Sequence, residues 1–281
     1  MLWSSGFIFL KIGLEYADPI SFLALRYVCV VALLLLPSIY YRKHFPTDIR
    51  TIGHIAMVGL LIQACYFSFV YLSLKWGISA GAVSLIVSQQ PILIALLAPA
   101  IAGEKVSAVH WLGLALGVSG AVLVTLSRSS VEVGSGIALA CAVLALLSMT
   151  GGTLWEKRFG AHVHPVASNM IQYIVGLAVT APLAYALEPM HFAWTSGLFI
   201  SLIYLVICNS LIAISLLLAM FRYGEASRAS ALFFLVPPAT AVIAYVVLGE
   251  ELSLLAWGGM LLAVTGLFLV TRTAYTGKAR P

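Results

Sequence analysis

Uncharged polar side chains occur in the middle of several long apolar segments, where they could hold a small solute. Gln63 is followed by Tyr66, Phe67 and Val70, a spacing that places all four residues on one face of a helix. Asn209 lies at the matching point of a later segment. Amides can orient the polar end of an amphipathic solute, and aromatic rings can cover its apolar end. We therefore expect a solute site here, although such side chains also form hydrogen bonds between membrane helices.

Other candidates for this site share the same character, a polar or aromatic side chain inside an apolar segment. The predicted lining consists of Gln63, Tyr66, Gln89, Gln90, Asn209, Ser148, Trp155, Phe234 and Tyr27. Pro91 and Pro237 lie in the middle of their segments beside some of these side chains. A proline there removes a backbone hydrogen bond and kinks a helix. We expect the two prolines to act either as hinges or as static kinks.

Arg26 is the one charged residue placed well inside an apolar segment. An arginine within a membrane can hold a carboxylate. Alternatively, its long side chain can extend to the outer interface and pair with Asp18 or Glu15. No Asp, Glu or His lies in the middle of a segment, which weakens a simple proton relay and leaves the coupling ion open.

The composition indicates that membrane helices position these residues. Of the 281 residues, 62% are hydrophobic and 9% are charged, and the mean hydropathy is +1.06. Soluble domains carry about 25% charged residues, so an ordinary soluble enzyme, a disordered protein and a classical nucleic-acid binder are excluded. The net charge of +5 is better explained by the orientation of a membrane protein. Catalytic clusters and metal-ligand spacings are absent from the sequence, and we expect no enzyme activity, metal or cofactor.

Apolar runs between charges and turn residues predict an all-α membrane protein with ten transmembrane helices. The segments are 1–16, 20–41, 51–73, 79–101, 108–127, 134–156, 165–187, 195–220, 227–248 and 254–272. With the N-terminus inside the cell, eleven Lys and Arg residues lie on the cytoplasmic side and three on the opposite side. Because positive charge marks cytoplasmic loops, we expect both termini in the cytoplasm.

The chain contains an internal repeat at a constant offset of 146 residues. Residues 103–125 (GEKVSAVHWLGLALGVSGAVLVT) align with residues 249–271 (GEELSLLAWGGMLLAVTGLFLVT). Each copy contains five segments, an odd number, so the second copy enters the membrane inverted, as in many transporters. We predict a first five-helix repeat over 1–128, an inverted repeat over 134–273 and a cytoplasmic tail over 274–281.

Residues 3–37 (WSSGFIFLKIGLEYADPISFLALRYVCVVALLLLP) and the closing pattern of each half (GE…S…W.G…..G..L) resemble the drug/metabolite transporter superfamily. The resemblance is to EamA-type exporters, among them the bacterial aromatic amino acid exporters, and it covers essentially the whole chain. It implies a peripheral scaffold formed by 108–127 and 254–272. It also implies a central cavity lined mainly by 1–16, 51–73, 79–101, 134–156, 195–220 and 227–248.

The start of the first segment departs from the family pattern. Met1 aligns with Leu147 of the second copy, so the first helix has no counterpart to residues 134–146. We expect the natural protein to carry roughly a dozen further apolar residues before Met1 to complete a span. For this reason no role is assigned to Trp3 or its neighbours.

Together these features predict an exporter in the bacterial inner membrane that works by alternating access. The expected cargo is an amino acid, aromatic or otherwise neutral, or a related metabolite or drug. The expected partners are this small solute and the lipid bilayer, a homodimer is a possible assembly, and nucleic acid is not expected. Two alternatives stay open: a transporter of phosphorylated solutes such as nucleotide sugars, and a membrane-embedded enzyme. The first would need several intramembrane Lys or Arg residues, and the second would need a catalytic cluster.

Overall fold

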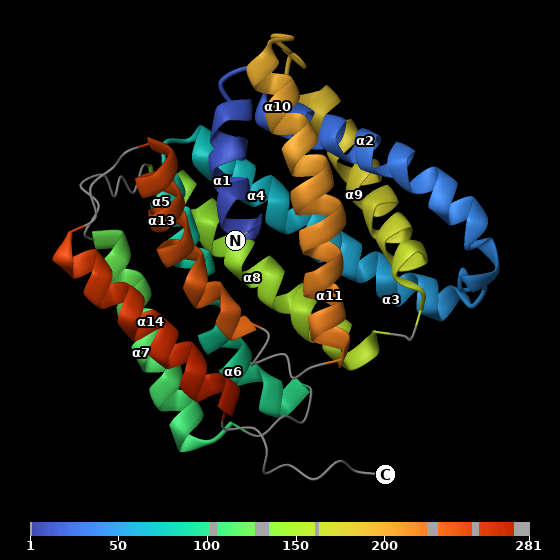
Figure 1. The fold of residues 1–281 in the computed structure, drawn as a ribbon. Helices are drawn as coiled ribbons and strands as arrows, with labels where there is room; N and C mark the ends of the chain where they lie inside the picture. The colour runs from blue at the N-terminus through green and yellow to red at the C-terminus, as the bar shows by residue number, and fades with distance from the viewer. Residues whose placement is uncertain are drawn as a thin grey trace.

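The computed structural model describes residues 2–101, 106–126, 135–160, 163–223, 230–248 and 253–272, and these residues form a bundle of helices (Figure 1). The first half contains α1 (Leu2–Gly13), α2 (Pro19–Tyr40), η1 (Arg42–His44), α3 (Ile49–Val58), η2 (Gly59–Tyr66), α4 (Phe67–Lys75), α5 (Ala80–Val87), α6 (Gln90–Ile101) and α7 (Ala108–Leu126). The second half contains α8 (Gly136–Phe159), α9 (Pro165–Leu187), α10 (Ser196–Tyr204), η3 (Leu205–Ala213), α11 (Ile214–Tyr223), η4 (Leu232–Leu235), α13 (Val236–Leu248) and α14 (Leu254–Arg272).

Each predicted segment corresponds to a helix or to a run of consecutive helical pieces, and the prediction of an all-α membrane protein is confirmed. Within the described residues, eight helical stretches are long and apolar enough to cross a membrane. A ninth apolar helix, Ser4–Gly13, is shorter. The predicted tail 274–281 lies outside the described residues.

Short polar residues and prolines set where several helices begin. The Asp48 carboxylate accepts hydrogen bonds from the backbone N–H and the hydroxyl of Thr51, each at 3.0 Å. These two bonds hold the pKa of Asp48 below its usual value. Ser79 and Ser135 cap α5 and α8 in the same way. Pro19 and Pro165, which are equivalent in the repeat, each occupy the first turn of a helix, where a missing N–H costs nothing.

The pairing of α7 with α14 displays the inverted symmetry of the two halves. A Cβ added at Gly113 would lie 2.8 Å from the carbonyl oxygen of Gly266, and one added at Gly259 would lie 2.8 Å from that of Gly120. Gly113 corresponds to Gly259, and Gly120 to Gly266, so the contact is reciprocal about a twofold axis between the helices. The two helices lie side by side at one edge of the molecule, as expected for a scaffold (Figure 1).

Away from this pair, the helices of the two halves interleave. α2 packs along α9, α1 packs against α10 and η3, and η2 packs against both α8 and α9 (Figure 1). Large aromatic side chains fill the space between them, and Tyr27, Tyr66, Tyr71 and Tyr173 are fully buried. The hydroxyls of such residues need hydrogen-bond partners, so the centre of the bundle is polar as well as aromatic.

Candidate functional site

Two π-helical segments occupy equivalent positions in the two halves, and each contains one of the predicted amide residues. η2 carries Gln63 within the third membrane segment, and η3 carries Asn209 within the eighth. A π-helical turn departs from the α-helical hydrogen-bond pattern and often occurs at functional sites. The Tyr27 hydroxyl donates to the Gln63 carbonyl at 2.6 Å, and the Tyr173 hydroxyl donates to the Ser210 carbonyl at 2.8 Å. In each half, therefore, a buried tyrosine hydroxyl donates to a backbone carbonyl of the π-helical segment.

A small cavity lies where α1, α2, α4 and the two π-helical segments meet. Its volume is about 20 Å³, room for roughly one water molecule. The lining consists of Gly6, Phe7, Leu10, Arg26, Tyr66, Phe67, Val70, Tyr71, Leu205 and Asn209. A Cβ at Gly6 would lie 3.0 Å from Nδ2 of Asn209, so the glycine makes room for the amide. The cavity thus combines a cation, an amide and several aromatic rings.

Arg26 is fully buried and faces this cavity instead of extending to the membrane surface. Its Nε donates to the Ser210 hydroxyl at 2.7 Å, and its Nη1 donates to the Tyr71 hydroxyl at 3.2 Å. The guanidinium carbon lies 4.6 Å from the centre of the Phe67 ring, a cation–π contact. The alternative in which Arg26 pairs with Asp18 or Glu15 is wrong, because its polar contacts are to Ser210 and Tyr71 and Asp18 accepts a bond from the His191 N–H instead.

Four of the predicted lining residues lie at or next to the cavity. Tyr66 and Asn209 line it directly, and both are buried. Gln63 is fully buried on the same π-helical turn as Tyr66, and Tyr27 is joined to it by the hydrogen bond to its carbonyl. Nε2 of Gln63 has no hydrogen-bond partner among the residues that the structure describes.

The other five predicted lining residues lie elsewhere in the bundle. Two glutamines lie at the break between α5 and α6: Gln89, in the turn, donates to the Leu85 carbonyl of α5, and Gln90 donates to the Thr153 hydroxyl of α8 at 2.9 Å. Ser148 is half-buried on α8. Trp155 packs against His54 and Phe159. Phe234 packs on α7, where a Cβ at Gly117 would lie 2.3 Å from its ring.

The predicted kinks coincide with breaks in two equivalent helices. α5 ends at Val87, a turn follows, and α6 begins at Gln90 just before Pro91. In the second half, the 3-10 segment η4 immediately precedes Pro237 in α13. Both breaks are present in the structure, whereas their role as hinges stays a prediction.

Two polar residues of the site, Tyr71 and Ser210, were not predicted. Both supply their hydroxyls to Arg26. Because an intramembrane arginine requires hydrogen-bond partners, Arg26 itself indicates that such partners exist. The sequence does not show which residues they are, because Ser210 lies in the other half of the repeat.

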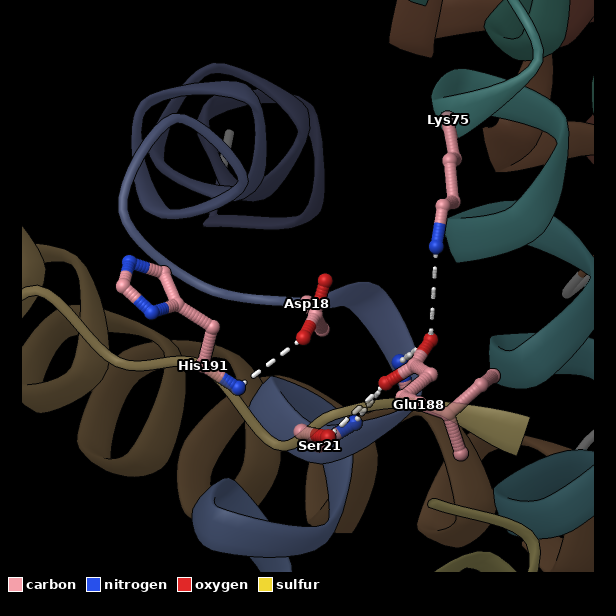
Figure 2. A network of polar contacts seen from close by, with 6 residues as sticks. Asp18, Ser21, Lys75, Glu188 and His191 are labelled. Carbon is pink, nitrogen blue, oxygen red and sulfur yellow. Dashed lines mark hydrogen bonds and ion pairs between the residues drawn. The ribbon is translucent and has the colours of Figure 1, made fainter. Parts of the chain in front are cut away.

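A second polar cluster, here called the clasp, joins the halves at one end of the bundle; its members are Asp18, Ser21, Lys75, Glu188 and His191 (Figure 2). The Glu188 carboxylate accepts bonds from the backbone N–H groups of Ile20 and Ser21 at 3.0 and 2.8 Å and from the Ser21 hydroxyl at 2.8 Å. A negative charge at the N-terminus of α2 is favourable for the helix dipole. Lys75 lies 3.8 Å from the same carboxylate. The clasp therefore links the start of α2 to the segment that follows α9.

Comparison with known proteins decides the family. The model of the EamA-like transporter family matches residues 1–126 and again residues 136–272. The chain belongs to the EamA-like transporter family. The two separate matches agree with the duplicated five-helix halves, and membership of this family confirms that the chain is a multi-pass membrane transporter and not an enzyme.

Individual EamA-like relatives are distant but extend over nearly the whole chain. The chain is 22% identical to the uncharacterized inner membrane transporter YedA of Escherichia coli, covering 100% of this chain and 90% of the relative. It is 25% identical to a probable amino-acid metabolite efflux pump of Salmonella typhimurium, covering 96% of this chain and 91% of the pump. A crystal structure of a protein with 18% identity shares the fold, with a TM-score of 0.79 over 96% of this chain and 93% of that one.

Proposed function

We propose that this EamA-like protein exports amino acids, aromatic or otherwise neutral, and related metabolites or drugs by alternating access. The observation that carries the proposal is the buried cavity at which two symmetry-related π-helical segments meet. Inverted repeats that enclose a polar site between them suit a transporter whose halves rock about that site. The names of the Salmonella and Escherichia coli efflux pumps support an amino-acid cargo. The finer resemblance of the sequence, to the bacterial aromatic amino acid exporter YddG, points to an aromatic one.

Both the size of the cavity and the clasp support a cycle of conformational change. A volume of about 20 Å³ cannot hold an amino acid, so cargo would enter only after the halves separate on one side. In the proposed orientation both termini are cytoplasmic and the clasp lies at the outer end, where it would hold the two halves together. The repeats 1–128 and 134–273 would move relative to each other, with Pro91 and Pro237 as hinges and 274–281 as a cytoplasmic tail.

The alternative of a phosphorylated cargo is less well supported by the charges. Among the lysines and arginines whose side chains the structure describes, Arg26 is the buried one, and the others are exposed or partly exposed. A sugar phosphate or nucleotide sugar carries more negative charge than one guanidinium can neutralise inside a membrane. Proteoliposomes loaded with a panel of amino acids and nucleotide sugars, assayed for counterflow with and without a pH gradient, test both cargo classes and the coupling. The absence of counterflow for every amino acid would overturn the proposal.

Substitution of single site residues should lower transport without loss of folded protein. Y66A removes a ring that lines the cavity, and Q63A removes the neighbouring amide. W155A removes a predicted lining residue that lies outside the cavity and packs against His54. Loss of an aromatic contact is worth about 0.5–1.5 kcal/mol, which corresponds to a roughly 2- to 10-fold lower initial rate. Initial rates of counterflow at equal reconstituted protein provide the measurement.

The matched control is Y185A, because Tyr185 is a tyrosine with an 83% exposed side chain on the outside of α9. It should transport at the wild-type rate. Unchanged flux in Y66A, Q63A and W155A together would show that the site has been placed wrongly. A loss in Y66A and Q63A alone would confine it to the cavity around the π-helical segments.

A further inference from the structure

The buried guanidinium of Arg26 has hydrogen-bonding capacity that nothing in the described part of the chain uses. Nε and Nη1 are bonded to Ser210 and Tyr71, whereas Nη2 is buried without a hydrogen-bond partner. A buried donor without a partner is destabilising, and more so when it is charged. Such a group calls for an explanation, and a partner that arrives at some stage of the protein's function is one.

The positive charge of Arg26 is also without a counter-ion among the described residues. The acidic residues in that part of the chain are Glu15, Asp18, Asp48, Glu156 and Glu188, and none of them forms an ion pair with Arg26. The neighbours that do contact it are two neutral hydroxyls and the rings of Phe67 and Tyr27. Intramembrane charges normally pair with one another, and an unpaired one marks a functional site.

The cavity places Arg26 beside groups that suit an amphipathic acid. Arg26, Asn209 and Tyr66 all line it, together with the apolar side chains of Phe7 and Leu10. Oδ1 of Asn209 also has no hydrogen-bond partner among the described residues. A guanidinium is a planar fork that matches a carboxylate, and the amide carbonyl could accept a bond from an ammonium group.

We propose that Arg26 binds the carboxylate of the transported solute, with Asn209 beside it to receive the ammonium group when there is one. This inference rests on the proposed function, because it assigns the cargo of the same cavity. A monocarboxylate would neutralise the single buried cation and occupy Nη2. A solute with the same ring but no carboxylate would leave the charge as it is in the empty site. The carrier should therefore select for a carboxylate before it selects for a side chain.

The proposed test compares three probes that differ only in their charged groups. They are L-phenylalanine, L-phenylalaninamide, which lacks the carboxylate, and 3-phenylpropanoate, which lacks the ammonium. The melting temperature of the purified protein in detergent is measured with each probe, and each is also used to compete with labelled phenylalanine in counterflow. We expect the two carboxylates to raise the melting temperature of the wild type and to compete, and the amide to do neither.

R26Q should lose this selectivity. A hydrogen bond to a charged group contributes about 1.5–3 kcal/mol, so the carboxylates should bind roughly 10- to 100-fold more weakly to R26Q. R26K keeps the charge but not the planar fork and should bind with an intermediate affinity. R26Q loses the bonds to Ser210 and Tyr71 but also removes a buried charge without a counter-ion, so these effects offset and R26Q should melt close to the wild type without ligand.

R158Q is the matched control, since Arg158 is an exposed arginine away from the cavity, whose side chain donates to the Ile101 carbonyl and lies over the Phe159 ring. It should keep the carboxylate preference of the wild type. Equal responses of the wild type to the amide and the carboxylates would overturn the proposal, and so would an R26Q protein that melts well below the wild type and still prefers carboxylates.

The two proposals fail in different ways. If the protein transports solutes that lack a carboxylate as well as those that have one, the export function stands and the role of Arg26 falls. If no solute is transported but carboxylates still stabilise the wild type and not R26Q, the binding site stands and the export function falls.

Discussion

The G120A protein should melt well below the wild type, because α7 and α14 approach each other more closely than alanine allows. A Cβ at position 120 would lie 2.4 Å from the backbone nitrogen of Ala263 and 2.5 Å from the carbonyl oxygen of Gly259. Both are backbone atoms, so no side chain can rotate out of the way. Overpacking of this kind costs about 1–3 kcal/mol, and more when a helix must move. The melting temperature and the yield of monodisperse protein in detergent provide the measurement.

G258A provides a control in the same helix pair. Gly258 neighbours Gly259 on α14, but a Cβ there meets nothing within 4 Å. An alanine at that position should stabilise α14 by up to about 1 kcal/mol, since glycine is the poorer helix former. If G120A and G258A melted at the same temperature, the close approach of the two helices would be refuted.

The inverted symmetry predicts an equal effect at the equivalent position of the second half. Gly266 is the repeat equivalent of Gly120, and a Cβ there would lie 2.4 Å from the backbone nitrogen of Gly117. G266A should therefore lower the melting temperature by about as much as G120A. A large difference between the two variants would mean that the halves do not share this contact equally.

Much of the fold could be predicted from the sequence, because its signals are local. Helix ends follow from residues such as Pro19 and Pro165, and the apolar runs between charges are as long as a bilayer requires. The repeat supplied the inversion, because an odd number of spans leaves no other arrangement. The scaffold pair was anticipated from the family resemblance.

The π-helical segments could not be predicted, because no residue type marks them. The sequence of η2, GLLIQACY, contains neither proline nor an unusual polar pattern. Its distinctive contact is tertiary: a Cβ at Gly59 would lie 2.8 Å from the Cα of Gln172 on α9. Packing against a helix of the other half is not a local property, and helical periodicity alone assumes a regular α-helix throughout.

The candidate site could be predicted only in part, again because tertiary contacts are not visible in the sequence. Tyr66 and Asn209 were found because a polar or aromatic side chain stands out inside an apolar run. Trp155 and Phe234 stand out equally well, but they pack against other helices, since type and spacing do not reveal which face meets which neighbour. Arg26 is far enough into its segment to be buried and near enough to its end to reach the surface. The packing of α2 against the second half decides between these alternatives.

Substitution of Glu188 by alanine should open the clasp end of the molecule, because this carboxylate holds the two halves together there. The residue follows α9 in the second half, yet it accepts two backbone bonds and one hydroxyl bond from the start of α2 in the first half. Its side chain is only 3% exposed. Each donor left without a partner costs about 1–3 kcal/mol, although water can satisfy part of this near the end of a bundle. A shift of about 3 kcal/mol would raise the population open at this end by roughly 100-fold.

Labelling of a cysteine behind the clasp can measure this opening. Leu10 is 4% exposed and lines the cavity, so L10C in a background without the four native cysteines should react slowly with a membrane-impermeant maleimide. Adding E188A should increase the labelling rate by about 10- to 100-fold. E188Q, which keeps an acceptor oxygen but loses the charge, should give an intermediate rate.

Two controls at the same end separate the hydrogen bonds of Glu188 from general electrostatics. K75Q removes only the 3.8 Å ion pair to a lysine that is 42% exposed, and such a pair is worth at most about 1 kcal/mol. E15A removes an exposed carboxylate for which the structure gives no hydrogen bond or ion pair to a described residue. Both should label almost as slowly as the parent protein. Because the clasp links the halves, we expect a transport cycle that separates them at this end to break it, and its bonds to set how long this end stays shut. Equal labelling in E188A and K75Q would contradict that role.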